Sequence, residues 1–411
     1  MNFSPHMDTL MKPFLNAFGQ CGKTPTPPSK TDKKLYQSVL ISLYKDIYDA
    51  NTTIFKDGCF QSQVIKEKGQ FKLPEGKDSR YFPAHIQKYI DANQTYQLVF
   101  SCGNVGKREI QVIFTLFEEL KKQEDYFTQC VKMIYIWLHM CSKYADQACT
   151  ETLNVFIYPT PFTKNLPTNP ATIIGPEHIN TAFTMSCVKN GQIIIFREEE
   201  WFKVLIHETF HSYGLDFATK EHSGLKNVLR EMFPINTDFD IYEAYTETWA
   251  RIINCAFCSF NALPEKDKKD QKGFLSNMIF CLEMERLFAF YQCIKLLGFM
   301  GLRYQDIYTT DQRTYLYKEK THVFAYYIMT TIFLNDSPGF MLWCKKNNTS
   351  LLKFNATSEN FQAFADYIRE NYKCISLLHG LGQMGTLNAK VNKSKNKTLQ
   401  TTTRMSIIHT I

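Results

Sequence analysis

The sequence predicts an α+β protein that is mainly helical and contains one small mixed sheet. Long segments before residue 150 and after residue 240 repeat apolar residues every three or four positions, as amphipathic helices do. Between them lie short apolar runs bounded by prolines or by an Asn-Gly pair, a pattern typical of strands. With 411 residues, of which 44% are hydrophobic and 21% charged, the chain is large enough to bury a full core.

The first part of the chain is expected to be a linker followed by helices. Residues 1–34 end in "KTPTPPSKTDKK", a proline-rich and polar stretch in which neither a helix nor a central strand should form. Apolar residues four apart between positions 35 and 47 share one helix face, and a second helical block is expected from residue 107 to 144. Residues 35–150 are therefore predicted to form an N-terminal helical subdomain.

Residues 151–262 carry the strands and are expected to form the functional core. "LNVFIYPTPF" predicts a strand that ends at its prolines, and "TAFTMSCVKNGQIIIFR" predicts two strands joined by Asn190-Gly191. "EEEWFKVLIHETFHSYG" predicts a helix with acidic residues at its positive end and Gly214 at its stop. A further helix is expected over "DIYEAYTETWARIINCAF".

The remaining chain is expected to be helical and then disordered. Residues 263–379 predict a C-terminal helical subdomain, and residues 380–411, rich in Gly, Asn, Lys and Thr, predict a basic disordered tail. The tail from residue 381 carries five basic residues and no acidic one, whereas the formal net charge of the whole chain is +7. The nearly neutral body argues against specific nucleic-acid binding, although the tail could touch a polyanion non-specifically.

Cysteine usage and hydropathy indicate where the protein works. Thirteen cysteines lack the spacing of a disulfide scaffold, and neither a secretory signal nor a membrane-spanning run is apparent. We therefore expect reduced thiols, a cytoplasmic location, no secretion and no membrane span. The oligomeric state is not indicated by the sequence.

The stretch "VLIHETFHSYG", residues 204–214, contains the chemistry of a metal site. His207 and His211 lie four apart, so a helix places both imidazoles on one face, where they can bind one ion. Glu208 lies about 100° further round the helix, so it can reach a zinc-bound water without ligating the metal. It can take the proton of that water and pass it to a leaving amine. Uncharged residues flank the motif, as in the extended signature of zinc metallopeptidases.

A catalytic zinc usually has three protein ligands, so a third must come from elsewhere. The metzincin pattern would place it at Phe217, which cannot bind metal, and Asp216 is one residue out of step. The gluzincin pattern, in which a later helix supplies a glutamate, fits "DIYEAYTETWA" better. Glu243 is then the third ligand, and Glu247, four residues on, would accept a hydrogen bond from a ligand histidine. The two roles could also be reversed.

From about residue 153 to 257 the chain thus resembles the gluzincin-type zinc metallopeptidases. The resemblance implies a zincin-like core with a small mixed sheet packed on the motif helix, one Zn²⁺ per chain, and hydrolysis of a peptide or protein substrate. It also implies that the substrate is added as a strand along the sheet edge, either "GQIIIFRE" or "TAFTMSC". With its composition, the chain is similar to metallopeptidases inferred in large nucleocytoplasmic DNA viruses, which implies a host-cytoplasmic or virion location.

One component of such a site is less well defined by the sequence. Hydrolysis needs a donor for the oxyanion of the tetrahedral intermediate, in such enzymes generally Tyr or His. His322 and Tyr326, one helical turn apart, are the candidates, and the alternatives nearer in sequence are Tyr242, Tyr245 and His222. The alternative function is a catalytically silent viral structural or interaction protein that kept the same fold.

Overall fold

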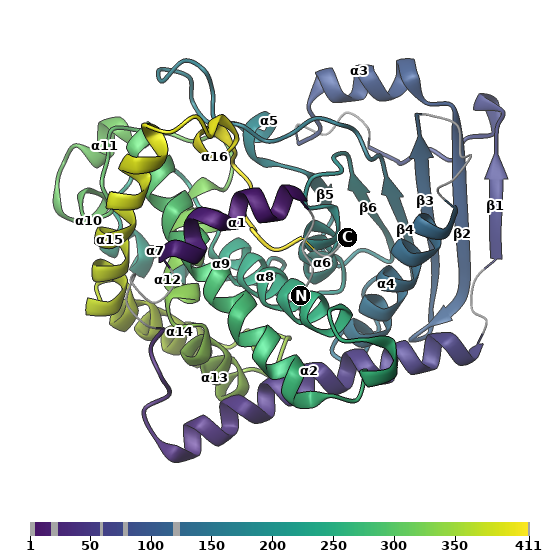
Figure 1. The fold of residues 1–411 in the computed structure, drawn as a ribbon, viewed down its shortest axis with the longest axis horizontal. Helices are drawn as coiled ribbons and strands as arrows, with labels where there is room; N and C mark the ends of the chain where they lie inside the picture. Colours follow the sequence, from purple (N-terminus) through teal and green to yellow (C-terminus); the bar gives the residue numbers. More distant parts are fainter. Residues whose placement is uncertain (1–4, 18–23, 58–60, 77–80, 118–123, 410–411) are drawn as a thin grey trace. The chain divides into compact units, whose positions relative to one another are not determined.

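The computed structural model describes residues 5–17, 24–57, 61–76, 81–117 and 124–409, and over these residues it shows an α+β protein with one six-stranded mixed sheet (Figure 1). The chain divides into two units. The sheet unit contains Leu43–Lys164 and Asn180–Thr219. The helical unit contains Met1–Ser42, Asn165–Ile179 and Lys220–Thr410. Each unit is therefore assembled from segments that are distant in the sequence.

The sheet has the strand order β1-β2-β3-β4-β6-β5. The middle strands β3, β4 and β6 are parallel to one another, and the outer pairs β1·β2, β2·β3 and β5·β6 are antiparallel. The strands span Gln61–Ile65 (β1), Tyr96–Val105 (β2), Arg108–Leu116 (β3), Thr152–Ile157 (β4), Ala182–Thr184 (β5) and Asn190–Ile195 (β6).

Both faces of the middle strands are covered by helices. On one face, Ile113 and its neighbours in register belong to an apolar cluster with Ile86 and Ile90 of α3 (Ala84–Asn93). On the other face, Phe114 packs against Phe127 of α4 (Glu124–Ser142), with ring centroids 4.9 Å apart. Trp137 of α4 stacks on Phe210 of α6 (Trp201–Ser212), at 6.1 Å. The motif helix α6 thus packs on α4, which itself covers this face of the sheet.

The helical unit is built around α8 (Ile241–Asn261) and α9 (Gln271–Phe299). Its other elements are α1 (Pro5–Ala17), the first part of α2 (Lys30–Asp57), α5 (Pro176–Ile179), α7 (Ser223–Met232), η2 (Glu265–Asp267), α10 (Asp306–Thr309), α11 (Arg313–Leu316), the π-helical η3 (Phe324–Met329), α12 (Thr330–Asn335), α13 (Ser337–Asn347), α14 (Ser358–Asn371), α15 (Ile375–Asn392) and α16 (Lys397–Thr401). The sheet unit also holds the short η1 (Lys68–Gln70). The prediction of helices over residues 263–379 is confirmed.

The prediction of an N-terminal helical subdomain over residues 35–150 is wrong in part, because three of the six strands come from it. Residues 108–116 form β3 rather than helix. Since both faces of this strand are buried, its apolar residues do not alternate with polar ones, and a spacing of three to four residues arises by coincidence. The first 34 residues also hold more helix than expected, because α1 lies within them and α2 begins at Lys30. Of the described residues in this region, 24–29 form no helix and keep the character of a linker.

The strand predictions around the motif helix fare better. β4 is confirmed, and β5 and β6 do pair antiparallel. Asn190-Gly191, however, is not the turn between them: both residues belong to β6 and pair with Thr152 and Leu153 of β4. Of the two predicted edge strands, "GQIIIFRE" is excluded because β6 is paired on both sides, and β5 of "TAFTMSC" forms the sheet edge.

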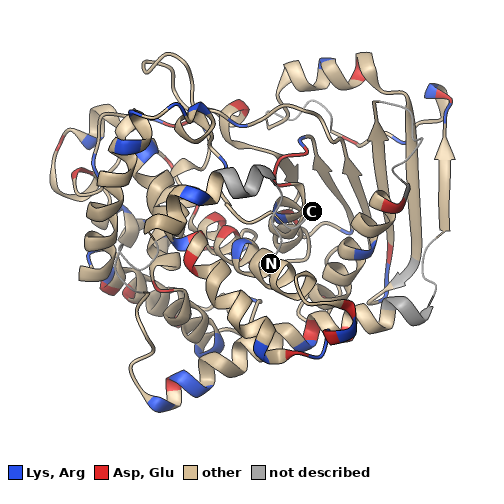
Figure 2. Ribbon diagram, in the orientation of Figure 1, with Lys and Arg blue, Asp and Glu red and all other residues tan. Residues whose placement is uncertain are grey.

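The disordered tail expected at residues 380–411 is wrong for the residues that the structure describes. Residues up to 392 continue α15, α16 follows, and Thr402–Ile408 are buried. The lysines of this region lie at exposed positions of and between these helices, where Figure 2 shows blue segments, whereas Arg404 is buried. No helix among the described residues is long and apolar enough to cross a membrane.

The buried end of the chain is held by a carboxylate on α9. Glu285 accepts hydrogen bonds from the backbone N–H groups of Ile407 (3.0 Å) and Ile408 (2.9 Å), and from the hydroxyl of Ser406. Its other oxygen accepts from Arg251 Nε of α8 at 2.7 Å. The side chains of both Arg251 and Glu285 are at most 1% exposed, so each charge depends on the other.

We expect Glu285→Ala to lower the free energy of unfolding by about 3–5 kcal/mol or more, because it leaves the Arg251 charge buried without its partner. The matched control is Asp366→Ala, which breaks the half-exposed pair with Arg369 on α14 and should cost under about 1 kcal/mol. Urea unfolding followed by circular dichroism measures both. Equal effects of the two substitutions would contradict the central role of the buried pair.

Candidate metal centre

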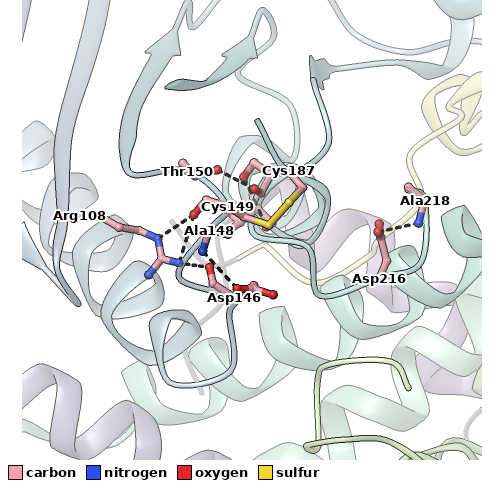
Figure 3. Close-up of a disulfide and its surroundings, with 10 residues drawn as sticks. Arg108, Asp146, Ala148, Cys149, Thr150, Cys187, Asp216 and Ala218 are labelled. Carbon is pink, nitrogen blue, oxygen red and sulfur yellow. Dashed lines mark hydrogen bonds between the residues drawn. A yellow bond between two sulfur atoms is a disulfide. The ribbon is translucent and has the colours of Figure 1, made fainter. Parts of the chain in front are cut away.

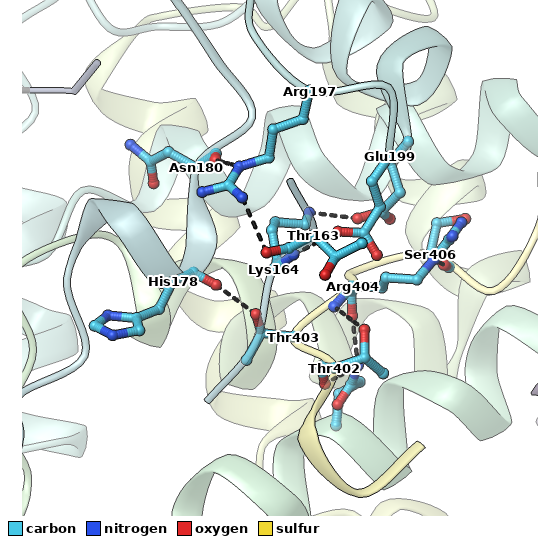
Figure 4. Close-up of polar contacts among 12 residues, drawn as sticks. Thr163, Lys164, His178, Asn180, Arg197, Glu199, Thr402, Thr403, Arg404 and Ser406 are labelled. Atoms are coloured by element: carbon cyan, nitrogen blue, oxygen red, sulfur yellow. Dashed lines mark hydrogen bonds and ion pairs between the residues drawn. The ribbon is translucent and has the colours of Figure 1, made fainter. Parts of the chain in front are cut away.

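The motif helix α6 begins at a turn stabilised by buried charges. Glu200, the residue before the helix, has a positive φ of 61° and forms a buried ion pair with Lys164. The backbone N–H of Lys164 donates to Glu199 at 2.7 Å, and Arg197 donates to the carbonyl oxygens of Asn180 and Thr163 at 3.0 Å each (Figure 4). Burial lowers the pKa of Lys164, an effect that the charge of Glu200 opposes. These contacts fix the start of a helix whose twelve residues are all buried.

The helix ends in a Schellman motif centred on Gly214. Its φ of +62° lies in the left-handed region, the N–H of Gly214 donates to His211 O (3.1 Å), and the N–H of Leu215 donates to Phe210 O (2.9 Å). A Cβ at position 214 would also lie 2.9 Å from the sulfur of Cys149. Glycine is therefore required here both by conformation and by space. The turn reverses the chain so that Asp216 points back at the helix.

Asp216 orients one of the two motif histidines. Its Oδ2 lies within hydrogen-bond distance of His211 Nδ1, and its Oδ1 accepts from the N–H of Ala218 at 3.0 Å (Figure 3). A carboxylate accepts but does not donate, so the Nδ1 atom carries the proton and the Nε2 lone pair is left for a cation. The metzincin pattern makes Asp216 only a ligand that is one residue out of step, and it does not predict this orienting role. An acidic residue two positions after the glycine that ends the motif helix is the signal that could have identified it.

The two imidazoles face one another as the motif predicts. His207 Nε2 and His211 Nε2 are 3.1 Å apart. Both residues are buried, with exposed fractions of 5% and 6%. Two nitrogens bound to one tetrahedral zinc at 2.0–2.1 Å lie about 3.3 Å apart. The observed separation therefore suits a shared divalent cation.

Glu243 lies in the first turn of α8 and is contacted by two polar side chains of its own unit. The hydroxyl of Tyr326 donates to Glu243 Oε2 at 3.0 Å, and His322 Nε2 lies 3.8 Å from Oε1. Both predicted oxyanion donors thus lie at this carboxylate. Tyr326 belongs to the π-helical η3, a conformation that is frequent at functional sites. Of the alternatives, Tyr245 donates to Leu352 O at 2.9 Å, and His222 packs its ring against Tyr242.

A buried carboxyl group caps the segment that carries Tyr326. Glu319 accepts a hydrogen bond from the backbone N–H of Phe324, the first residue of η3, at 2.9 Å, and one from Tyr317 at 3.3 Å. Burial raises the pKa of Glu319 to about 8. Burial therefore favours the neutral form of this residue, which holds the start of η3 through its hydrogen bond to Phe324.

The three residues predicted as metal ligands form a buried group that could hold a metal ion. One ligand atom from each of His207, His211 and Glu243 lies within 4.8 Å of the others. Glu208, the predicted general base, is 7% exposed, and Glu247 is fully buried one turn after Glu243 on α8. Phe217, at the third-ligand position of the metzincin pattern, is fully buried, as expected of a core residue.

A disulfide lies directly against the end of the motif helix. Cys149 and Cys187 are bonded, the N–H of Cys187 donates to His211 O at 3.1 Å, and the hydroxyl of Thr150 donates to Ser212 O (Figure 3). The expectation that the thiols are reduced is wrong for this pair, and an oxidised pair gives no indication of a cytoplasmic location. The cross-link joins the segments before β4 and β6 to the turn that holds Asp216.

Comparisons with known proteins add no relative: no family model, no curated protein and no solved structure matches this chain. The assignment of the site therefore depends on the residues and their geometry.

We expect Asp216→Asn to weaken the binding of an added divalent metal ion, tested with Zn²⁺, by about 10–100-fold, because the amide no longer holds the Nδ1 proton of His211 as a carboxylate does. Competition with a chromophoric chelator measures the dissociation constant. Glu109→Gln, which removes an exposed carboxylate from β3, is the control and should leave it unchanged. Unaltered affinity in the Asp216 variant would show that this contact does not tune the metal site.

We expect the double substitution Cys149→Ser, Cys187→Ser to lower the free energy of unfolding by about 2–4 kcal/mol, because the cross-link closes a loop of 38 residues. Denaturant unfolding measures this loss. Alkylation of the unfolded, unreduced chain, followed by mass spectrometry, should leave both cysteines unmodified. Alkylation of all thirteen cysteines would contradict the bond.

Proposed function

We propose that the chain is a zinc-dependent peptide-bond hydrolase of the gluzincin type. The observation that carries this proposal is the buried group of His207, His211 and Glu243. Two imidazoles and one carboxylate are a donor set of catalytic zinc sites, which leave one position open. Zinc in such a site supplies a Lewis acid that lowers the pKa of water and polarises a carbonyl group.

The residues around this group have the chemistry that hydrolysis requires. Glu208 is the general base and acid: its carboxylate takes a proton from the attacking water and returns it to the leaving amine. Asp216 keeps the Nδ1 proton on His211, so that Nε2 stays available as a ligand. Glu247 is a candidate to orient the other histidine from α8.

Tyr326 and His322 are the candidates for stabilising the oxyanion. Both are neutral or cationic donors, and both lie at the carboxylate of Glu243 in the structure. A donor placed beside a metal ligand lies near the position where negative charge develops on the substrate oxygen. The Tyr326 hydroxyl lies closer to this carboxylate than His322 does, with a hydrogen bond of 3.0 Å. Its single proton would turn from Glu243 to the oxyanion of the intermediate.

The substrate in this proposal is a peptide or an unfolded segment of a protein. β5 forms the edge of the sheet and precedes α6 by one strand, so its outer backbone groups could pair with an extended peptide. The resemblance to metallopeptidases inferred in large DNA viruses supports a location in the host cytoplasm or the virion.

The test compares the unmodified chain with Glu208→Gln and His211→Ala. We expect about one zinc per chain in the unmodified protein and in Glu208→Gln, and none in His211→Ala, by plasma mass spectrometry. Cleavage of a peptide library should fall by about 10²–10⁴-fold in Glu208→Gln, because the general base is lost while the metal stays. Removal of zinc by a chelator should abolish cleavage, and added zinc should restore it.

Glu151→Gln, which removes an exposed carboxylate before β4, is the control and should cleave like the unmodified chain. Bound zinc without any cleavage would favour the silent binding protein instead. Equal zinc content in His211→Ala and the unmodified chain would overturn the assignment of the ligands.

A further inference from the structure

A cavity of about 680 Å³ lies in the sheet unit, apart from the residues of the candidate metal centre. Its walls come from the ends of all three parallel strands: Leu116 ends β3, Ile157 ends β4, and Glu198 follows β6. Trp201, the first residue of α6, also lines it. The crevice outside the carboxyl ends of parallel strands is where open sheets commonly bind ligands, and the volume suits a small molecule.

The walls of this cavity are largely aromatic. Besides Trp201, rings are contributed by Tyr89 of α3, Phe117 after β3 and Tyr126 of α4. Tyr89 and Phe117 meet edge to face with centroids 5.2 Å apart, so their orientations are set by one another. Aromatic faces carry negative electrostatic potential and attract cations as well as apolar groups.

The charge of the residues that line the cavity also favours a cation. Among the described residues that line the cavity, Glu198 is the one acidic or basic side chain. The thiol of Cys130 and the hydroxyl of Tyr126 stay neutral, because burial raises the pKa of Cys130 to about 12 and raises that of Tyr126 as well. Glu198 is still solvent-exposed on one side, and partial burial raises the pKa of its carboxyl group. A cation inside the cavity would offset this loss of hydration.

We propose that the cavity between α3, α4 and the start of α6 binds a small organic cation, in which an ammonium group is carried on an apolar, preferably aromatic, body. The ammonium group pairs with the Glu198 carboxylate, and the apolar body lies against the rings of Trp201, Tyr89 and Phe117. An uncharged molecule of the same shape keeps the apolar contacts and loses the ion pair. An anion meets the repulsion of Glu198. This proposal is independent of the proposed hydrolase activity.

The test is calorimetric titration of the full chain at pH 7.5 with three probes of similar shape: 2-phenylethylamine, 2-phenylethanol and 3-phenylpropanoate. We expect the amine to bind with a dissociation constant of about 1 mM or tighter, and at least about tenfold more tightly than the alcohol. The acid should bind most weakly. Titrations with and without a zinc chelator should agree, since an amine that coordinated the candidate metal centre would lose affinity when zinc is removed.

Glu198→Gln should reduce the affinity for the amine to that for the alcohol and leave the alcohol unchanged. Glu151→Gln removes an exposed carboxylate at the opposite, amino end of β4 and should change neither. Equal affinity of the unmodified chain for amine and alcohol would overturn the proposal. So would the absence of binding by all three probes at about ten times the expected dissociation constant, or an unchanged preference in Glu198→Gln.

Discussion

The structure of the candidate site depends on one constraint, the orientation of two imidazoles on a helix that is buried along its whole length. Neutral histidines inside a protein need a fixed tautomer if their lone pairs are to meet at one point. At His211 this is achieved by a glycine-terminated turn that brings Asp216 back onto the ring. The disulfide and Thr150 bind the last carbonyl groups of the same helix, so the turn has little freedom to move away. The turn at Gly214 thereby determines which ring nitrogen of His211 is left to bind a cation.

Buried carboxylates surround the two histidines of the candidate site. Glu208, Glu243 and Glu247 are all at most 7% exposed, and buried carboxylates are costly unless cations or donors compensate them. Tyr326 supplies a donor to Glu243, and a divalent cation bound by His207, His211 and Glu243 would add positive charge to the same place. Burial raises the pKa of Glu319 and so favours its neutral form in the segment that carries Tyr326.

Local patterns predicted the parts of the fold that lie near the motif. α6 and its stop at Gly214 follow from helical spacing and a left-handed terminal residue, and α8 follows from a long amphipathic repeat. β3 was missed because it is covered on both faces and so lacks alternation. The turn predicted at Asn190-Gly191 does not form, because both residues pair with the neighbouring strand β4. Cys149 and Cys187 are far apart in sequence, and nothing in their spacing indicates a bond. The Gly-, Asn-, Lys- and Thr-rich composition of residues 380–411 predicts disorder. Residues 402–408 are nevertheless ordered, because the side chains of Lys295, Gln292 and Glu285 form hydrogen bonds with their backbone.

The place of β4 in the sheet has a practical consequence for anyone who prepares shortened versions of this protein. The segment 151–262 contains the motif and would be a natural choice of fragment, but β4 within it pairs on its other side with β3, which that fragment lacks. A central, apolar strand would then present an unpaired edge to solvent, and such edges recruit other chains. Expression of that fragment would therefore be expected to yield insoluble aggregates, whatever the chemistry of its histidines.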